Sequence, residues 1–228
     1  EKDSLLGVMM ASGRKNLDFV MCNGDMVNTL SRKEKIMDRF LKTAAKALKG
    51  ETPLYVARGN HEMRGRDAIR WIDCFATPTG ETYYSFTVGT NFFIVLDSYE
   101  DKPDDDINYN GKLVTEPFWK KESHWLRSVL DSEECRNAER RIVFCHIPPD
   151  RKGWHGNRNV SEYLVPLLNE AKVDMMFSAH IHKWALYPAG DSGTGALFPI
   201  VVNPNRERME VTLYPDTVEI RTFSPDGK

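Results

Sequence analysis

The alternation of short apolar runs with an amphipathic helix constrains the fold of this chain more than any other sequence feature. One apolar run covers residues 17–22, and a second, LYVA, covers residues 54–57. The segment between them predicts a helix closed by Gly50, because its apolar residues recur every four positions, at Ile36, Phe40, Ala44 and Leu48. Two strands joined by a helix form a βαβ unit, whose strands normally lie parallel.

The rest of the chain adds a hairpin, two helices and further strands. Strands at 83–88 and 92–97 flank the turn Gly89-Thr90-Asn91, and apolar residues at helical spacing predict helices near 119–130 and 160–170. Further strands are expected at 140–146 and 173–178, and a β-meander is expected from residue 183 onward. The polar stretch 99–112 predicts an exposed loop. The pattern indicates an α/β fold with mixed strands, and no repeat or composition break divides residues 1–228 into domains.

Charge and cysteine content exclude several classes of protein. The chain has 228 residues, with 31 Lys and Arg against 33 Asp and Glu, so its formal net charge of -2 disfavours a nucleic-acid partner. No apolar run reaches the roughly 20 residues that span a bilayer. The 4 cysteines include no CxxC pair and do not suggest a disulfide framework, which leaves the compartment open.

Polar side chains follow four of the predicted strands, at the point where each strand ends. In chain order they are Asp25, Asn60 with His61, His146, and His180 with His182. In open α/β sheets the loops beyond the carboxyl ends of the strands converge on the ligand site. A carboxylate, an amide oxygen and imidazoles are ligands suited to Mn, Fe or Zn rather than to calcium. The sequence therefore predicts a metal site at this edge.

Each of these residues also has a structural reading when it is taken alone. Asp25 is a plausible helix cap, Asn60 a turn former, and His146 a buried core imidazole. Their occurrence together, each at a strand end, favours ligation. His124 lies on a charged helix beside lysines and is expected at the surface, whereas Asp97 is either a hydrogen-bond acceptor for a ligating histidine or a strand-end turn residue.

The order of these motifs resembles the calcineurin-like metallophosphoesterase family. Gly24-Asp25, the string GNHE at 59–62, a strand-terminal His146 and the H-x-H of residues 180–182 match four of the family's five blocks, over about residues 17–184. The GNHE form is similar to the purple acid phosphatase branch. The resemblance implies a four-layer αββα sandwich of two mixed β-sheets flanked by helices. It also implies cleavage of phosphate esters by a metal-bound hydroxide at a centre of two divalent ions, Mn, Fe or Zn.

The resemblance also implies a role for each matching residue. By position, Asp25 bridges the two cations, Asn60, His146 and His180 complete one site, and His182 belongs to the other. The family's opening block, D-x-H, is absent, because no Asp stands two residues before any of the 6 histidines. We therefore expect the second metal site to be incomplete in this chain and the first strand to lie upstream of Glu1.

The chain departs from the family pattern in two smaller ways besides the absent D-x-H block. Ala179 replaces a usual glycine. Asn28 stands where purple phosphatases carry a tyrosine ligand, so their ferric site and colour are not expected.

Four further residues are candidates for acting on the substrate. His61 follows a predicted ligand and is the candidate acid for the leaving alkoxide. Arg64 and Arg66 are candidates for binding phosphate oxygens, with a solvated helix start as the alternative reading. His155, beside Trp154 in a glycine-rich loop, is a candidate substrate contact.

Two other functions remain open from the sequence: a non-catalytic interaction module on the same fold, and a nuclease of the same family. The branch resemblance slightly favours an exported protein over a cytoplasmic one. Oligomeric state, substrate identity and the choice between monoester and diester are not determined.

Overall fold

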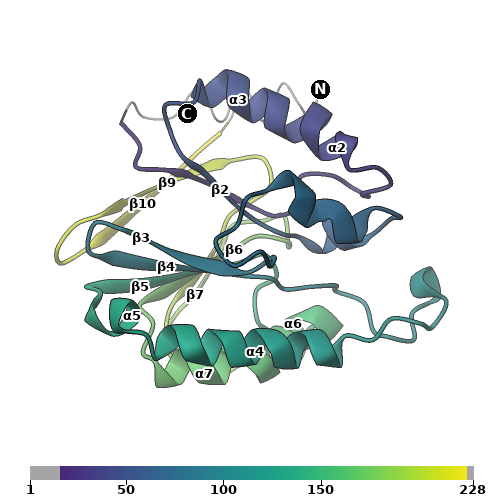
Figure 1. Cartoon of the computed structure of the whole chain (residues 1–228). Helices are drawn as coiled ribbons and strands as arrows, with labels where there is room; N and C mark the ends of the chain where they lie inside the picture. Colours follow the sequence, from purple (N-terminus) through teal and green to yellow (C-terminus); the bar gives the residue numbers. More distant parts are fainter. Residues whose placement is uncertain (1–15, 225–228) are drawn as a thin grey trace.

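Two β-layers lie face to face between two layers of helices (Figure 1). The structure is a computed structural model, which describes residues 16–224. The upper helix runs continuously through α2 (Glu34–Ile36), the π-helical turn η1 (Met37–Leu41) and α3 (Lys42–Leu48). The lower helices are α4 (Glu116–Leu130), α5 (Glu133–Asn137), α6 (His155–Asn159), the π-helical turn η5 (Val160–Leu164) and α7 (Val165–Glu170). This arrangement confirms the αββα sandwich.

A six-stranded mixed sheet forms the lower β-layer. Its order is β3-β4-β5-β6-β8-β7, in which the four central strands are parallel and both edge strands are antiparallel to their neighbours. The strands are β3 (Tyr84–Val88), β4 (Asn91–Leu96), β5 (Arg140–Cys145), β6 (Met175–Ser178), β7 (Ala185–Tyr187) and β8 (Ile200–Val202). The hairpin predicted around Gly89 is confirmed as β3 and β4.

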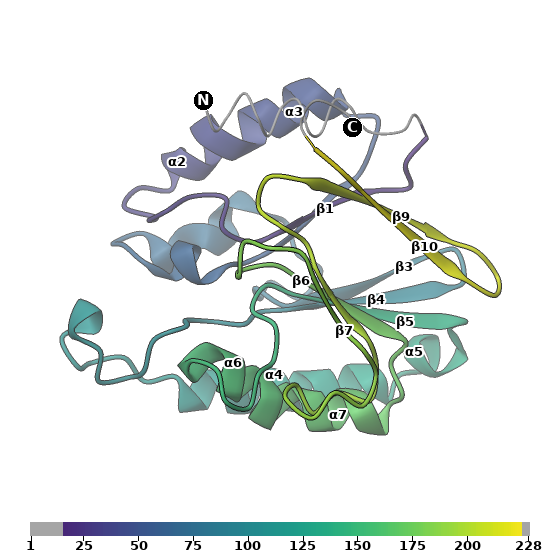
Figure 2. The same ribbon diagram turned by 180° about the vertical axis from the view of Figure 1, so that it is seen from behind.

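The upper β-layer contains two strand pairs. β1 (Val20–Asn23) lies parallel to β2 (Leu54–Ala57), with Val20 opposite Leu54, which confirms the βαβ unit. β9 (Arg208–Leu213) and β10 (Val218–Phe223) form an antiparallel pair. Figure 2 shows β9 and β10 in the same layer as β1, facing the six-stranded sheet.

Two sequence expectations are corrected by the structure. The strands after residue 183 do not form one meander, because β7 and β8 pair in the lower sheet and β9 and β10 pair in the upper layer. The stretch 99–112 is not exposed throughout, since Glu100 and Asp101 are buried. Both differences arise from long-range packing, which local polarity does not report.

Aromatic side chains fill the space between the two β-layers. The Phe19 ring makes edge contacts with four rings, those of Tyr55, Phe86, Phe93 and Phe144. Phe93 also stacks on Phe144, at 6.2 Å between ring centroids. Such pairs stabilise a fold beyond their buried area by about 0.5–1.5 kcal/mol each. The core therefore fixes how β1 and β2 sit over β4 and β5, and so where their loops end.

Short 3-10 turns complete the described elements: η2 (Asn60–Met63), η3 (Ala68–Cys74) and η4 (Ile107–Tyr109). The first of these follows β2 after Arg58 and Gly59 and carries Asn60, His61 and Glu62 of the GNHE string. Within residues 16–224, no helix is long and apolar enough to cross a bilayer. The first strand of the family pattern is expected upstream of Glu1, and this prediction lies outside the described residues.

Candidate metal centre

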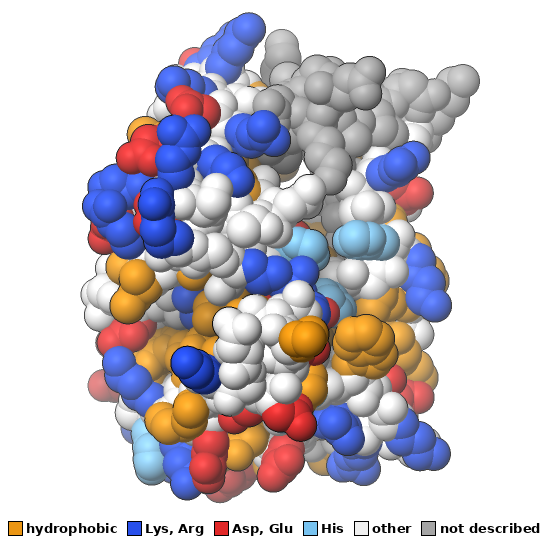
Figure 3. All heavy atoms as spheres, turned by 90° about the vertical axis from the view of Figure 1, so that its right-hand side faces the viewer, with side chains coloured by type: hydrophobic (Ala, Val, Ile, Leu, Met, Phe, Trp, Pro, Cys, Tyr) orange, Lys and Arg blue, Asp and Glu red, His pale blue; other side chains and the backbone are white. Residues whose placement is uncertain are grey.

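The carboxyl ends of β1, β2, β5 and β6 meet at one end of the sandwich. Figure 3 views the molecule from this end and shows histidine side chains gathered near the middle of the face, with Lys and Arg side chains beside them. A separate histidine at the lower edge of the view lies apart from this group. The side chain of His124 is exposed, which confirms its expected surface position.

Three predicted ligands converge at this end. Asp25, His146 and His180 each offer one ligand atom, and these atoms all lie within 4.8 Å of one another. Asp25 Oδ2 is 3.2 Å from His146 Nε2. Asn60 is buried beside this group, with its Oδ1 at 3.2 Å from His180 Nδ1. Residues 155 positions apart in the chain therefore come within ligand distance of one point.

The backbone around Asp25 has an unusual conformation. Gly24 has φ 85° and Asp25 has φ 57°, both in the left-handed region. A Cβ on Gly24 would collide with the His146 imidazole, and one on Gly59 would collide with the Asp25 carboxylate. Only glycine fits at either position. His180 (φ 63°) and His182 (φ 57°) are also left-handed, which an L-residue adopts at a cost and which is common at functional sites.

Hydrogen bonds set the orientation of the His146 ring. His146 is 1% exposed, and its Nδ1 lies 2.6 Å from the carbonyl oxygen of Asn23. Because only a protonated Nδ1 can donate to that carbonyl, the lone pair of the neutral ring lies on Nε2. Nε2 is buried beside Asp25 without a hydrogen bond of acceptable geometry among the described residues.

Burial and neighbouring charges set the protonation states of Asp25 and His180. Burial by itself raises the pKa of Asp25, but the nearby imidazoles of His146 and His61, together with the backbone N–H of His61, outweigh it and lower the pKa to about 2. Burial, followed by the charge of His146, lowers the pKa of His180 to about 4. At neutral pH, Asp25 is therefore a carboxylate and His180 a neutral imidazole, the forms that bind metals.

His61 lies at the edge of the cluster and is partly exposed. Its backbone N–H donates to Asp25 Oδ1 at 3.1 Å, and its Nδ1 lies 3.0 Å from the carbonyl oxygen of Asn28. Its Nε2 is 3.9 Å from Asp25 Oδ2. The ring therefore presents Nε2 to the centre.

The other predicted site residues differ in their placement. Arg64 lies beside His61, with 3.4 Å between its Nη1 and His61 Nε2. The Arg66 side chain is 78% exposed and pairs with Asp67. His182 is exposed and does not belong to the group of three. His155 is half-buried at the start of α6, and its buried Nε2 has no partner among the described residues.

Asp97 takes the second of its two predicted roles, that of a strand-end turn residue, because its Oδ1 accepts the backbone N–H of Tyr99 at 2.9 Å just after β4. It is fully buried and accepts a hydrogen bond from Arg58 Nε at 2.8 Å and one from the Thr82 hydroxyl. This pairing compensates a buried charge with a charge-assisted bond, because an unpaired carboxylate would be strongly unfavourable there.

Glu62 is the residue of this site whose role the sequence reasoning missed. Its buried carboxylate accepts backbone N–H groups from Asp25 and Gly59 through Oε2 and from Val27 through Oε1, all at 2.8–2.9 Å. Burial and the Asp25 charge raise the pKa of Glu62 to about 7, although the donors lower it. The available signal was its place in the GNHE string, which follows the predicted strand 54–57.

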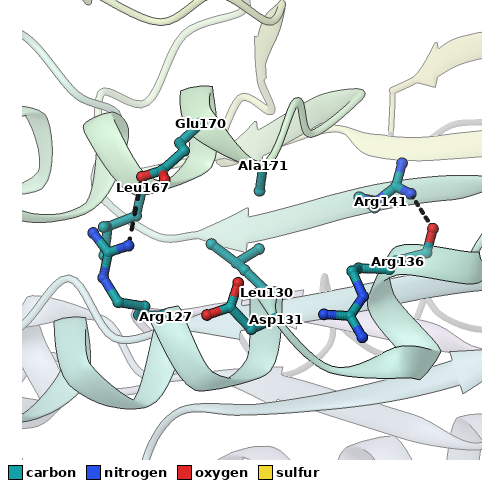
Figure 4. Close-up of a pocket in the computed structure, with 8 residues that line it drawn as sticks. All are labelled: Arg127, Leu130, Asp131, Arg136, Arg141, Leu167, Glu170 and Ala171. Carbon is teal, nitrogen blue, oxygen red and sulfur yellow. Dashed lines mark hydrogen bonds and ion pairs between the residues drawn. The ribbon is translucent and has the colours of Figure 1, made fainter.

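A cavity of about 420 Å³ lies at the opposite end of the fold (Figure 4). It lies near the start of β5, between the short helix α5 and the carboxyl ends of α4 and α7. Its lining residues are Arg127, Leu130, Asp131, Arg136, Arg141, Leu167, Glu170 and Ala171. Arg127 and Glu170 form an ion pair across it at 3.5 Å. None of the predicted site residues lines this cavity, so it is separate from the candidate centre.

The residues present fit a divalent transition metal. A carboxylate, an amide oxygen and two imidazoles are the mixed oxygen and nitrogen donors that Mn, Fe and Zn accept. The buried His146 Nε2, which lacks an acceptable hydrogen bond among the described residues, is the ligand atom such a cation would satisfy. Fold and site together define an αββα sandwich of the metal-dependent hydrolase type.

Comparison with known proteins identifies the family. Residues 4–184 match the model of the family described as "Calcineurin-like phosphoesterase", and the chain belongs to this family. The chain is 29% identical over 177 residues to mouse "Serine/threonine-protein phosphatase CPPED1", covering 72% of this chain and 53% of that protein. The human protein of the same name is 26% identical over 177 residues. The chain thus spans about half the length of the curated relatives it matches.

Solved structures show the same fold. The chain is similar to the purple acid phosphatase PPD1 of yellow lupin seeds, with a TM-score of 0.67, 14% identity and coverage of 99% of this chain and 48% of that one. It is also similar to Plasmodium GAP50, described as the anchor in the inner membrane complex, with a TM-score of 0.56 and 15% identity over 98% of this chain and 73% of that one. These likenesses confirm the metallophosphoesterase fold.

Proposed function

We propose that this chain hydrolyses phosphate esters at a centre of two divalent cations, Mn, Fe or Zn, at the carboxyl ends of β1, β2, β5 and β6. The convergence of Asp25, His146 and His180 within 4.8 Å carries the proposal. Membership of the phosphoesterase family supports the reaction class. We assign the whole of residues 1–228 to this single domain.

Each ligand has a proposed place in the centre. Asp25 is the bridging ligand, because its two oxygens face different neighbours, His146 on one side and the His61 backbone on the other. Asn60, His146 and His180 complete the first cation site. His182 is the ligand that this chain contributes to the second.

The chain's own residues provide binding and proton transfer. Bound cations would polarise the phosphoryl oxygens and acidify the attacking water. His61, held at Nδ1 by the Asn28 carbonyl, directs Nε2 towards the centre, where a proton on this nitrogen passes to the leaving alkoxide oxygen. The Arg64 guanidinium beside His61 binds a phosphoryl oxygen.

The relatives named as serine/threonine-protein phosphatases suggest the substrate class. We extend this to the present chain as a preference for phosphomonoesters of serine and threonine over diesters. A phosphoserine peptide is therefore expected to be cleaved faster than bis(4-nitrophenyl) phosphate. A faster diester reaction would contradict the preference and favour the nuclease alternative.

The central test replaces the bridging carboxylate. Asp25→Asn keeps the size of the side chain but removes its charge, and is expected to lower hydrolysis of 4-nitrophenyl phosphate by at least about 10³-fold with Mn²⁺ or Zn²⁺ present, because a metal ligand is lost. Asp105→Asn, an exposed change of the same charge, serves as the control. A wild-type rate no higher than that of Asp25→Asn, with every divalent metal tested, would remove the proposal. Less than one bound cation per chain would favour the non-catalytic module.

A further inference from the structure

Two carboxylates from the segment after β4 hold the Arg64 guanidinium. Arg64 Nε lies 3.3 Å from Glu100 Oε2, and Nη2 lies 3.1 Å from Glu100 Oε1 and 2.9 Å from Asp101 Oδ1. Arg64 ends the turn that carries GNHE, so these contacts join two segments about 36 residues apart. The pairing with Glu100 is bidentate, the geometry in which a guanidinium is most firmly oriented.

These contacts leave one edge of the guanidinium facing the candidate centre. Nε and Nη2 donate to the carboxylates, whereas Nη1 points to His61, at 3.4 Å from Nε2. A guanidinium is planar and its donors are fixed relative to one another. The position of the two carboxylates therefore determines the direction of Nη1.

The carboxylates themselves are firmly held. The side chain of Glu100 is 0% exposed and that of Asp101 is 11% exposed, against 24% for Arg64. Glu100 also accepts a hydrogen bond from the Tyr109 hydroxyl, and Asp101 also accepts one from Lys102 Nζ at 3.0 Å. Exposed ion pairs contribute little because water competes with them, but these carboxylates are largely shielded from water.

The first residues of α6 close the other side of this network. The Gly156 N–H donates to the Asp101 carbonyl oxygen at 3.2 Å. A Cβ on Gly156 would lie 2.9 Å from the Asp101 Cα, which is too close for any other residue without a shift. The segment that carries Glu100 and Asp101 is thus fixed by packing as well as by charge.

We propose that Glu100 and Asp101 are positioning residues that hold Arg64 Nη1 at the substrate side of His61, so that the guanidinium is oriented for a phosphoryl oxygen before substrate arrives. The inference rests on the proposed function. It predicts that both carboxylates contribute to phosphate affinity although neither touches phosphate. A residue that only stabilised the loop would contribute to folding and not to affinity through Arg64.

The test uses charge-removing changes of equal shape, Glu100→Gln and Asp101→Asn. Binding of inorganic phosphate to the metal-loaded protein is measured by titration calorimetry, with metal content and thermal midpoint recorded for each variant. Each change is expected to raise the Kd for phosphate about tenfold, which corresponds to about 1.4 kcal/mol. The KM for 4-nitrophenyl phosphate should rise with it, and kcat should change less.

A double-mutant cycle separates positioning from a structural role. In an Arg64→Ala background, Asp101→Asn should have no further effect on phosphate affinity, because the residue through which it acts is gone. Arg64→Lys keeps the charge but not the bidentate fork, and should also weaken phosphate binding. Asp105→Asn removes the same charge from an exposed position of the same loop and should leave the Kd within about twofold.

Two results would overturn the inference. One is an unchanged phosphate Kd in folded Asp101→Asn, and the other is an equal loss with and without Arg64. If Glu100→Gln does not fold, Asp101→Asn still decides. Failure of the proposed function looks different, since the wild type itself would then show neither metal-dependent hydrolysis nor phosphate binding.

Discussion

Both ring nitrogens of His61 have a defined environment. Nδ1 faces the Asn28 carbonyl oxygen at 3.0 Å, and Nε2 faces Arg64 Nη1 at 3.4 Å and Asp25 Oδ2 at 3.9 Å. At the position where purple phosphatases carry a tyrosine ligand, the backbone oxygen of Asn28, and not its side chain, therefore orients the His61 imidazole. The ring is directed at the centre by a main-chain group that no side-chain motif records.

His61→Asn tests the acid role at this position. It is expected to slow an alkyl phosphate by roughly 10²-fold or more but 4-nitrophenyl phosphate by only a few fold, because a poor leaving group needs the proton and nitrophenolate does not. Steady-state rates on both esters give the comparison. Equal slowing of the two substrates would reject the acid role and leave His61 as a phosphate-binding group.

At the scale of elements, Glu62 joins the loops after β1 and β2. Its carboxylate accepts N–H groups of Asp25 and Val27 from the first loop and that of Gly59 from the second. These are the loops that carry Asp25, the proposed bridging ligand, and Asn60. One buried side chain therefore sets the spacing between two proposed ligands, and the backbone donors it satisfies would otherwise be unpaired.

Glu62→Gln is expected to destabilise the protein by about 1–3 kcal/mol. An amide presents one acceptor atom and one donor group, so at least one of the three backbone N–H groups would face another donor. Urea denaturation of the two proteins measures the difference, and a parallel metal titration should show weaker binding. A variant as stable as the wild type, with the same metal affinity, would show that these contacts do not set the loop spacing.

A second buried acid links α4 to the end of β4. Glu122 Oε1 accepts the backbone N–H of Asp97 at 2.7 Å, and burial, together with the Asp97 charge, raises the Glu122 pKa well above its ordinary value. A raised carboxyl pKa means that the folded protein keeps a proton which the unfolded chain releases above about pH 4.5. Stability from this group is therefore full below that pH and falls as pH rises towards the folded pKa.

Glu122→Gln removes this pH dependence while keeping the carbonyl acceptor for Asp97. Between about pH 5 and pH 8, the free energy of unfolding of the wild type should fall relative to the variant, by at most about 1.4 kcal/mol per pH unit. Urea denaturation at a series of pH values gives both curves. Parallel curves over this range would mean that Glu122 is ionised in the folded protein at neutral pH.

For the whole molecule, the candidate centre joins parts of both β-layers. Asp25 and Asn60 come from loops of the upper layer, and His146 and His180 follow strands of the lower sheet. A cation held by both sets stabilises the folded state only, because the unfolded chain keeps these ligands apart. Metal binding and global stability should therefore be coupled.

The coupling predicts a metal-dependent shift in thermal stability. Free Mn²⁺ or Zn²⁺ at about 100 times its Kd should raise the free energy of unfolding by about 2.7 kcal/mol, and a chelator should reverse this. Asp25→Asn should lose most of the shift. Protein of residues 1–228 is expected to bind one cation more tightly than a second, since three clustered ligands serve the first; two equally tight cations would contradict this.

The sequence by itself determined the βαβ unit, the hairpin of β3 and β4, and the chemical identity of the proposed ligands. Hydrophobic periodicity placed the helix of residues 34–48 and the strands of the βαβ unit, and the motifs at strand ends placed Asp25, Asn60 and His146. Periodicity is a local property, and the carboxyl ends of parallel strands converge by geometry, so both could be inferred without coordinates.

Tertiary structure alone decided which side chains meet across those ends. The contacts of Glu62 with Asp25 and of Arg64 with Glu100 join residues 36 or more positions apart. They depend on the register and packing of two β-layers, which no local pattern specifies. For the same reason the segment 99–112 was wrongly expected to be exposed, and the split of the last four strands between two layers was not foreseen. Polarity predicts contact with water only where no buried partner of opposite charge is available.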